Sequence, residues 1–335
     1  MSQNLKEKYV LCCDWGTSSF RLRLVSSYDY SIIAEFLSQN GVASIFKAWQ
    51  EQKEKTRFDF YSSFLMECIQ ELAKNTSTPI QNIPLIVSGM VSSSIGMEEL
   101  SYAEIPFDTL GSTASIKTFQ NFNGKGPLLL VSGVKSSEDV MRGEETQLIG
   151  LIKLIEIKNQ DSKNLVFIFP GTHSKHIFVK NGLIHDFQTF MTGELFNIIK
   201  EHSILKDSVE SDSESISKTE IDAFLLGIEV SSKSSILHNL FTVRTNQLFG
   251  TFAKKENLFY LSGLLIGTEI RQLDQKSFDH LFVCSGNNLY DYYKLAFDTI
   301  FPSENITFIK PEMIDKATIA GQIQLFYTQI NSSHE

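Results

Sequence analysis

The stretch VLCCDWGTSSFRLRLV, from Val10 to Val25, decides the fold. An apolar run ends on Asp14, the chain turns at Gly16, and it continues as an alternating strand from Phe20 onward. Alternating apolar and polar residues predict a strand, and a glycine between two such runs predicts a β-hairpin. The turn carries three hydroxyl side chains together with backbone N–H groups, so it is suited to hold a phosphate.

The same order of elements returns near residue 165. In LVFIFPGTHSKHIFVKNGLIHDFQTFMTGELFNII (165–199), an apolar strand stops, the chain turns through Gly171 and Thr172, and a second strand follows. An Asn-Gly pair then predicts a hairpin, a third strand and a helix whose N-cap is expected at Thr192. Strand, glycine-hydroxyl turn, strand, hairpin, strand and helix therefore occur twice, which indicates an internal duplication.

A third glycine turn follows a late apolar strand. In LFVCSGNNLYDYYKLAF (281–297) the strand ends at Ser285, and Gly286 and Asn287 precede a helix. A helix N-terminus at the carboxyl edge of a strand presents backbone N–H groups to an anion. Each turn alone is ordinary turn chemistry. Two matching hairpin turns and this third turn together predict a nucleotide site.

Composition limits the function classes. At 335 residues the chain exceeds the usual length of one core, so two domains are expected, and the net charge of −9 argues against a nucleic-acid partner. The four cysteines lie in apolar runs without metal-ligand spacing, which predicts buried thiols in a cytoplasmic protein. The first ten residues lack the apolar core of a secretory signal, and no apolar run approaches the ~20 residues of a membrane span.

Six motifs, spread in order along nearly the whole chain, carry a family resemblance. They are DWGTSSFRLRL (14–24), SGMVSSSIG (88–96), DVMRGEETQLIG (139–150), PGTHSKHI (170–177), FMTGELF (190–196) and YLSGLLIGTEI (260–270). The set closely resembles the 2-keto-3-deoxygalactonate kinases, also called 2-dehydro-3-deoxygalactonokinases. The segments MRGEETQLIG and MTGEL are rare enough to make the resemblance specific.

The resemblance implies an α/β fold of the actin-like, hexokinase-type ATPase class, with two duplicated ribonuclease H-like domains and a nucleotide cleft between them. The first domain, 1–162, would bind the sugar acid and the second, 163–335, the nucleotide. ATP and Mg²⁺ are the implied cofactors. The implied reaction phosphorylates 2-keto-3-deoxygalactonate to its 6-phosphate in galactonate catabolism, and a homodimer is left open.

Phosphoryl transfer needs a metal ion and N–H donors around the migrating group. Asp14, at a strand end, is the expected catalytic and Mg²⁺-binding residue; the alternative is an Asx turn that stabilises the hairpin. Related actin-like kinases often begin the second phosphate turn with an aspartate where this chain has Pro170, which leaves Asp14 as the better metal partner. Lys175 is either aimed at phosphate or a solvated strand residue. The nucleotide-binding candidates are Gly16, Thr17, Ser18, Gly171, Thr172, His173, Lys175, Gly286 and Asn287.

The RGEETQ segment (142–147) is expected to open a helix. Acidic residues in a first turn are stabilised by about 0.3–1 kcal/mol through the helix dipole, which accounts for one of Glu144 and Glu145. Successive helix residues project about 100° apart, so the other is the candidate base for the sugar hydroxyl. Glu145 is favoured over Glu144, and Asp139 is a third candidate. The Arg142 guanidinium suits a sugar-acid carboxylate, and its alternative is a surface ion pair with Glu145.

Further substrate candidates stand at the strand ends of the first half. They are Arg21, Ser88, Gly89 and Met90, each of which also fits an ion pair or an ordinary strand-end turn. The same fold serves phosphohydrolases and non-catalytic ATP-switch regulators, which remain the alternative functions. The serine- and acid-rich segment 207–220 is expected to be a solvated loop without a site.

Overall fold

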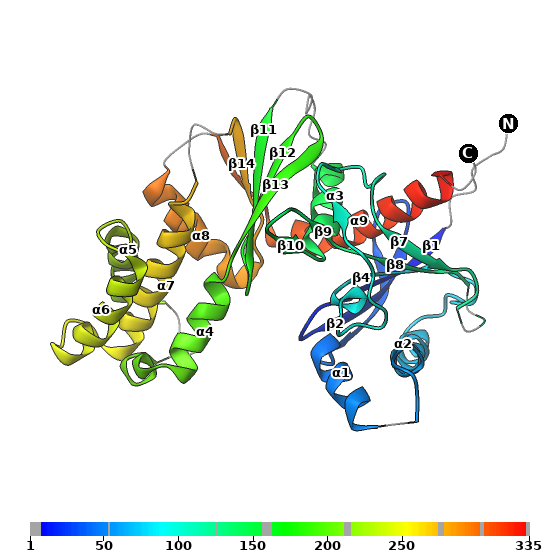
Figure 1. Ribbon diagram of the computed structural model, residues 1–335, viewed down its shortest axis with the longest axis horizontal. Coiled ribbons are helices and arrows are strands. Elements are labelled where there is room, and N and C mark those ends of the chain that lie inside the picture. Colours follow the sequence, from blue (N-terminus) through cyan, green and yellow to red (C-terminus); the bar gives the residue numbers. More distant parts are fainter. Residues whose placement is uncertain are drawn as a thin grey trace. The chain divides into compact units, whose positions relative to one another are not determined.

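The computed structural model describes residues 8–52, 54–122, 124, 126–155, 163–210, 216–273, 278–301 and 305–332 (Figure 1). They form two compact units. The first contains the described residues of Met1–Asp161, Lys180–Asp186 and Glu312–Glu335. The second contains those of Ser162–Val179 and Phe187–Pro311.

The first unit is built on a mixed sheet with the strand order β3-β2-β1-β4-β8-β7. The first three strands pair antiparallel, whereas β1, β4 and β8 run parallel to one another. This order and these directions are the ribonuclease H-like arrangement. The strands are β1 (Tyr9–Trp15), β2 (Phe20–Ser26), β3 (Ile32–Ser38), β4 (Leu85–Gly89), β7 (Ile116–Phe119) and β8 (Leu128–Val131).

Helices α1 (Val42–Glu51) and α2 (Arg57–Lys74) contribute to the core of this unit. Trp15 and Phe20 stand opposite each other on β1 and β2 and are fully buried with Tyr61 of α2. The α2 helix begins where the Thr56 side chain accepts a hydrogen bond from the Asp59 backbone N–H, the usual N-cap arrangement. The predicted hairpin is therefore confirmed.

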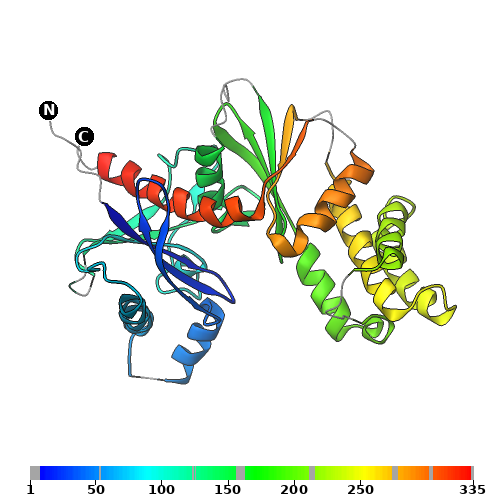
Figure 2. The same ribbon diagram turned by 180° about the vertical axis from the view of Figure 1, so that it is seen from behind.

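Two further helices, α3 (Glu144–Leu154) and α9 (Pro311–Ser332), cross at glycines. A Cβ on Gly150 would lie 1.8 Å from the Ala317 carbonyl oxygen, and one on Gly321 would lie 1.8 Å from the Thr146 carbonyl oxygen. Figure 2 shows α9 running across the first sheet. The Gln322 side chain on α9 donates to the carbonyl of Cys13 and to Ser88 Oγ, at 2.7 and 2.8 Å.

These contacts correct the expected domain limits. The second domain was expected to run from 163 to 335, but the described residues of Glu312–Glu335 group with the first unit because α9 packs on α3 and β1. Short elements complete this unit: β5 (Ala103–Glu104), β6 (Phe107–Asp108), β9 (Val134–Lys135), β10 (Val140–Met141) and the 3₁₀ turn η1 (Met90–Ser92). The β6 strand pairs with Leu183 and Ile184, which belong to the same unit.

The second unit repeats the strand arrangement of the first, with β15-β14-β11-β12-β13 in order. Its strands are β11 (Asn164–Phe169), β12 (Ser174–Lys180), β13 (Leu183–Phe190), β14 (His280–Val283) and β15 (Ile306–Phe308). The end of β12 and the start of β13 fall in Lys180–Asp186, which groups with the first unit. Short turns join β11 to β12 and β12 to β13, so these neighbours run antiparallel. The β11, β14 and β15 strands are parallel. The predicted duplication and the predicted fold class are therefore both confirmed.

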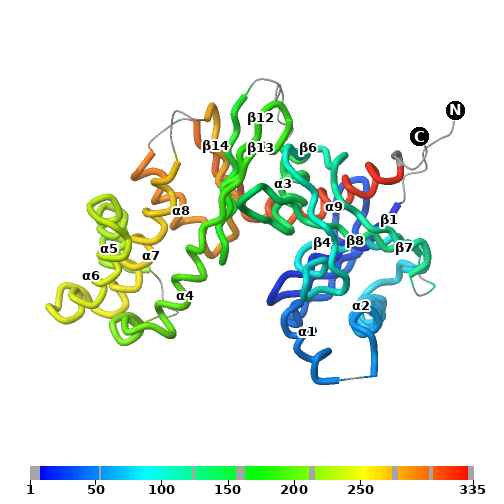
Figure 3. The backbone as a smooth tube through the Cα atoms, in the orientation of Figure 1, coloured from blue at the N-terminus to red at the C-terminus, as the bar shows by residue number. Residues whose placement is uncertain are grey.

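Helices dominate the rest of the second unit. They are α4 (Thr192–His202), η3 (Ile204–Ser208), α5 (Lys218–Val230), α6 (Ile236–Leu248), α7 (Lys254–Ile270) and α8 (Asn287–Ile300). Figure 3 shows α5, α6 and α7 side by side. The α7 helix is largely buried. Among the described residues, no helix is both long and apolar enough to cross a lipid bilayer.

The segment 207–220 differs from the expected solvated loop at both ends. Ser208 lies in η3 and is fully buried. Ser217 and Glu220 form a reciprocal capping box that starts α5, because the serine side chain accepts from the Glu220 backbone while the glutamate accepts from the Ser217 backbone. Residues 211–215 of the expected loop lie outside the described residues.

Candidate active site

Asp14 lies at the carboxyl end of β1, in register with Ser88 of β4 and Arg21 of β2. The Arg21 Nη1 atom donates to Asp14 Oδ2 at 3.1 Å, and 27% of the aspartate side chain remains exposed. Burial raises the pKa of Asp14, and the neighbouring Arg21 charge opposes that rise. The side chain thus pairs with a strand residue and does not form the Asx turn that was the alternative.

The first glycine turn, 16–18, turns its carbonyl groups toward the start of α1. The carbonyl oxygens of Gly16 and Thr17 accept hydrogen bonds from Val42 N and Ala43 N, at 2.9 and 3.1 Å. The side chains of Thr17 and Ser18 are exposed. Because the carbonyls are occupied by α1 and the hydroxyls face solvent, this turn has the polarity that an anion site requires.

Two glycines with positive φ bring α3 close to the end of β4. Gly89 has φ 94° and Gly143 has φ 115°, values that strain any residue with a Cβ. A Cβ on Gly143 would lie 3.7 Å from the Gly89 Cα, and one on Gly89 would lie 2.8 Å from the Trp15 carbonyl oxygen and 3.5 Å from Asp14 Oδ1. Glycine at both positions therefore lets the N-terminus of α3 lie beside the β1–β4 strand ends.

Glu145 stands buried in the first turn of α3, with 2% of its surface exposed. Its Oε2 accepts from Gly143 N at 2.8 Å, and its Oε1 accepts from Thr146 Oγ1 at 2.9 Å. Burial raises the pKa of Glu145 to about 7, and the Glu144 charge adds to the rise. Glu144 is only half-buried, and its Oε2 accepts from Arg142 N at 3.1 Å. The two glutamates are inequivalent, and Glu145 is the one with a pKa near neutrality.

Arg142 is held along one edge of its guanidinium. Its Nη1 donates to Ser92 O and Ser92 Oγ, both at 2.5 Å, and to Ser132 Oγ at 3.4 Å. Its Cζ lies 4.2 Å from the centroid of the Tyr102 ring. The Nε atom is buried and has no hydrogen-bond partner in the described part of the chain. The guanidinium thus bonds Ser92 and lies over the ring of Tyr102. These contacts hold it, rather than the ion pair with Glu145 that was the alternative expected from the sequence.

The remaining candidates of the first unit have different surroundings. Ser88 is fully buried and its Oγ accepts from Gln322, so its hydroxyl supports the strand end. Met90 starts η1 directly after Gly89 and is half-buried. Asp139 Oδ1 accepts from Val140 N at 2.7 Å, in the loop that precedes α3. Among these candidates, Glu145 bonds the Gly143 backbone, and a Cβ on Gly89 would lie 3.5 Å from Asp14 Oδ1.

In the second unit the Gly171–His173 turn lies against the start of α4. A Cβ on Gly193 would lie 2.5 Å from the Gly171 carbonyl oxygen, and Glu194 N donates to Thr172 O at 3.0 Å. His173 Nε2 pairs with the Glu194 carboxylate. A Cβ on Gly171 would meet no atom within 4 Å, so the space next to this turn is open.

Lys175 is buried rather than solvated, with 5% of its surface exposed. Its ammonium group donates to Thr189 Oγ1 on β13. On the far side of β11, the predicted turn of Gly286 and Asn287 forms the start of α8, with Gly286 as the N-cap residue. Both glycine turns of the second unit thus stand where the sequence places them, while the Lys175 ammonium is engaged within the sheet.

Thr192 does not cap α4 as predicted. The N-cap is Met191, and Thr192 is the first helical residue, with its hydroxyl donating to the carboxylate of Glu269 on α7. The helix begins one residue earlier than expected, and the Thr192 side chain, which would have capped it, instead contacts Glu269. A local pattern of a hydroxyl residue before a helix carries no information about such a distant partner.

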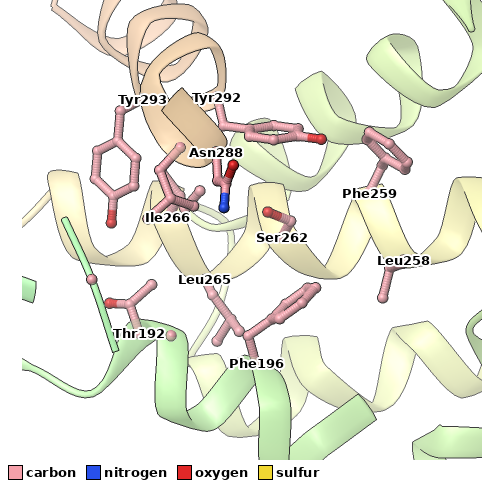
Figure 4. Close-up of a pocket in the computed structure, with 13 residues that line it drawn as sticks. Thr192, Phe196, Leu258, Phe259, Ser262, Leu265, Ile266, Asn288, Tyr292 and Tyr293 are labelled. Carbon is pink, nitrogen blue, oxygen red and sulfur yellow. The ribbon is translucent and has the colours of Figure 1, made fainter. Parts of the chain in front are cut away.

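A pocket opens between the second glycine turn and helices α4, α7 and α8 (Figure 4). Its volume is about 750 Å³, part of which is open solvent. Its walls are mostly apolar and aromatic, with Ser262 and Asn288 pointing inward. The lining residues are Gly171, Thr192, Gly193, Phe196, Leu258, Phe259, Ser262, Leu265, Ile266, Asn288, Leu289, Tyr292 and Tyr293.

Most of this lining was absent from the sequence candidates. Gly171 was included, and Asn288 follows the predicted Asn287 directly. The α7 residues were missed, although Ser262 stands in the motif YLSGLLIGTEI, where a serine-glycine pair interrupts an apolar helix. That interruption was the available signal, since a helix buried on all sides has little need for a polar residue.

Residues 14–323 match the family model described as 2-keto-3-deoxy-galactonokinase. The chain is 31% identical to the 2-dehydro-3-deoxygalactonokinase of Escherichia coli strain K12 over 66% of its own length and 72% of that protein. It is 30% identical to a Rhizobium meliloti protein named as a candidate for the same activity, over 78% and 79% of the two chains. A crystal structure of a candidate 2-dehydro-3-deoxygalactonokinase from Sinorhizobium meliloti superposes with a TM-score of 0.75 at 27% identity, covering 95% of this chain and 97% of that one. The chain therefore belongs to the 2-keto-3-deoxygalactonokinase family of phosphotransferases, as its motifs predict.

Proposed function

We propose that this chain transfers the γ-phosphoryl group of ATP to 2-keto-3-deoxygalactonate and forms the 6-phosphate. The observation that carries the proposal, beyond family membership, is the state of Arg142. Its Nη1 is fixed by Ser92, its face is covered by Tyr102, and its buried Nε has no partner among the described residues. An arginine held in this way is prepared for a planar anion, and the carboxylate of a sugar acid is such a group.

The acceptor hydroxyl requires a base close to that carboxylate site. Glu145 follows Arg142 by three residues, and its pKa of about 7 is suited to taking up a proton near neutral pH. Its Oε2 is bound to the backbone of Gly143, the glycine that lies beside Gly89 and the end of β1. We assign proton transfer to Glu145 and the support of the Arg142 backbone to Glu144.

Asp14 fits the demands of Mg²⁺ in a kinase. Magnesium in such sites takes one or two carboxylates and completes its shell with water and phosphate oxygens. Asp14 is a partly exposed carboxylate at a strand end. The described residues contain no group of three or more acidic, histidine or cysteine side chains that could hold a metal ion. The ion would neutralise charge on the phosphates, while Asp14 holds it and Arg21 orients Asp14.

The second unit supplies the nucleotide site in this proposal. The pocket of Figure 4 starts at Gly171 of the second glycine turn and continues to Asn288 and Tyr292 of α8. The turn and the α8 N-terminus offer backbone N–H groups to phosphates, and the aromatic and aliphatic walls suit a purine base. A cytoplasmic site of action agrees with the four cysteines, which are all free and buried.

A coupled ADP-release assay tests the proposed function. The purified chain with ATP and Mg²⁺ is given a panel of keto-deoxy sugar acids and their neutral sugar analogues. We expect ADP release only with an acid acceptor, fastest with 2-keto-3-deoxygalactonate. ADP release without any acceptor would indicate a phosphohydrolase, and ATP binding without turnover would indicate a regulator.

A further inference from the structure

Glu269, on α7, is a buried carboxylate that accepts hydrogen bonds from three other elements. Only 2% of its surface is exposed. Its Oε1 accepts from Ser174 Oγ at 2.6 Å and faces His176 Nε2 at 3.1 Å. Its Oε2 accepts from the Tyr293 hydroxyl at 2.8 Å and from the Thr192 hydroxyl. Four donors from β12, α4 and α8 thus meet on one side chain.

The two carboxylate oxygens serve two different parts of the second unit. Both partners of Oε2, Thr192 and Tyr293, line the pocket, where Figure 4 shows them on the same side. Both partners of Oε1 lie on β12, and Ser174 directly follows the Gly171–His173 turn. Glu269 itself is not among the described residues that line the pocket. Glu269 therefore connects the strand after the Gly171–His173 turn to the pocket wall without lining the pocket.

The partners depend on Glu269 for their orientation. His176 is fully buried with its ring 4.4 Å from that of Phe190, and its Nδ1 has no hydrogen-bond partner in the part of the chain that the structure describes. A carboxylate accepts, so Nε2 carries the imidazole proton and Glu269 fixes the ring. Burial, and then the Glu269 charge, raise the pKa of Tyr293 well above its usual value, which keeps its hydroxyl a donor. Without Glu269 these buried donors would lose their acceptor.

We propose that Glu269 is a positioning residue for the nucleotide, which it does not touch. Through Ser174 and His176 it fixes the phosphate turn, and through Thr192 and Tyr293 it fixes the pocket wall, so that both present one arrangement to the ligand. The inference rests on the proposed nucleotide site in this unit. A site whose groups are already in place loses less conformational freedom on binding and binds more tightly.

Glu269→Gln tests this role because an amide keeps the size of the side chain but has one accepting oxygen in place of two. In either orientation, its NH₂ group, which cannot accept, faces two donors: those on β12 or the two hydroxyls of the pocket wall. We expect the dissociation constant of a non-hydrolysable ATP analogue, measured by calorimetry without sugar acid, to rise about tenfold or more. The KM for ATP should rise in parallel, while the KM for the sugar acid stays within about twofold. Glu229→Gln, on the exposed surface of α5, is the matched control and should leave both values unchanged.

Milder variants keep the test decisive if Glu269→Gln folds poorly. Tyr293→Phe keeps the ring in the pocket wall and removes its hydroxyl. Thr192→Val removes the other hydroxyl and keeps the size of the side chain. Each should weaken analogue binding by about 2–10-fold, and Thr192→Ser should restore it. If the hydroxyls act through Glu269, the effect of Tyr293→Phe should be smaller in the Glu269→Gln background than in the wild type.

The outcomes separate this inference from the proposed function. A wild-type chain that binds no ATP analogue would overturn both. A wild type that binds, with Glu269→Gln, Tyr293→Phe and Thr192→Val all at the wild-type dissociation constant, would overturn the positioning role alone. A fall in melting temperature without any change in nucleotide affinity would assign Glu269 a purely structural role.

Discussion

The Cζ atom of Arg142 lies 4.2 Å from the centroid of the Tyr102 ring, so the guanidinium stacks on an aromatic face. The same arginine is fixed through Nη1 by Ser92, which leaves its Nε edge without a partner among the residues described. Stacking of this kind contributes about 0.5–2 kcal/mol and fixes the plane of the guanidinium. If the Nε edge of Arg142 binds the substrate carboxylate, Tyr102 orients the guanidinium toward that carboxylate.

Replacing Tyr102 should therefore affect recognition of the acid. Tyr102→Ala should raise the KM for the keto-deoxy acid by about 2–30-fold, the equivalent of the lost stacking energy, while the KM for ATP stays nearly constant. Tyr102→Phe keeps the aromatic face and should behave like the wild type. Arg142→Lys should raise the same KM further, since an ammonium cannot form the two-point contact. Unchanged KM values for the acid in Tyr102→Ala and Arg142→Lys would remove this pair from the substrate site.

The pKa of Glu145 gives the reaction a pH signature. A base with a pKa of about 7 is active when ionised, so kcat should rise with pH up to about 7 and then level off. Glu145→Gln should lower kcat by about 10²–10⁴-fold and abolish that rise, with little change in KM. Glu144→Gln is the matched control: it changes the neighbouring carboxylate that bonds the Arg142 backbone, and it should keep the rise of kcat with pH, shifted to lower pH because the Glu144 charge adds to the raised pKa of Glu145. If kcat of Glu145→Gln still fell at low pH as in the wild type, another residue would be the base.

The same buried carboxyl should make stability depend on pH in an unusual direction. The pKa of Glu145 is raised from 4.5 to about 7 on folding, so the folded chain binds the extra proton between these values and loses stability as the pH rises through them. The cost of ionising Glu145 in the folded state at pH 8 is about 3 kcal/mol. Glu145→Gln, which has no charge to bury, should therefore gain stability relative to the wild type between pH 5 and pH 8. Denaturant titrations of both chains at the two pH values measure this gain, and a constant difference would contradict the raised pKa.

Local sequence pattern predicted the elements that depend on neighbouring residues. The Asp14–Gly16 hairpin, its copy at Gly171 and the helix that opens at Glu144 follow from apolar periodicity and glycine turns, and the structure has all three. These features form from residues close in the chain, so their signals are local. The repeated strand order indicated the duplication, and the family resemblance implied the fold class.

Features made by distant residues were missed or misplaced. The α9 helix belongs with the first unit because Gly321 fits against Thr146, a contact between segments 175 positions apart that no local pattern reveals. Thr192 looked like a helix cap, but its hydroxyl donates to Glu269 instead. Lys175 was expected to be either aimed at phosphate or solvated, and its burial against Thr189 contradicts the solvated alternative.

Asp14 should be needed for turnover more than for folding. Its side chain is partly exposed and its hydrogen bond goes to Arg21, so Asp14→Asn should leave the fold intact. If Asp14 holds Mg²⁺, kcat should fall by several orders of magnitude while nucleotide affinity changes modestly, because metal positioning carries phosphoryl transfer. Asp222→Asn, at an exposed position of α5, is the control. Wild-type turnover in a folded Asp14→Asn chain would exclude it from the site.

The last prediction concerns two glycines that differ in what surrounds them. A Cβ on Gly171 meets nothing within 4 Å, so Gly171→Ala should fold with a free energy of unfolding within about 0.5 kcal/mol of the wild type. Gly171 also lines the pocket proposed for the nucleotide, so if that assignment is right, the added methyl group should raise the dissociation constant of an ATP analogue. Gly150→Ala provides the contrast, since its Cβ would lie 1.8 Å from the Ala317 carbonyl oxygen and force α3 and α9 apart. That variant should lose about 1–3 kcal/mol or more of stability, as overpacking does. Calorimetry on both variants separates the two effects, and unweakened analogue binding by a folded Gly171→Ala chain would show that the ligand does not approach this turn.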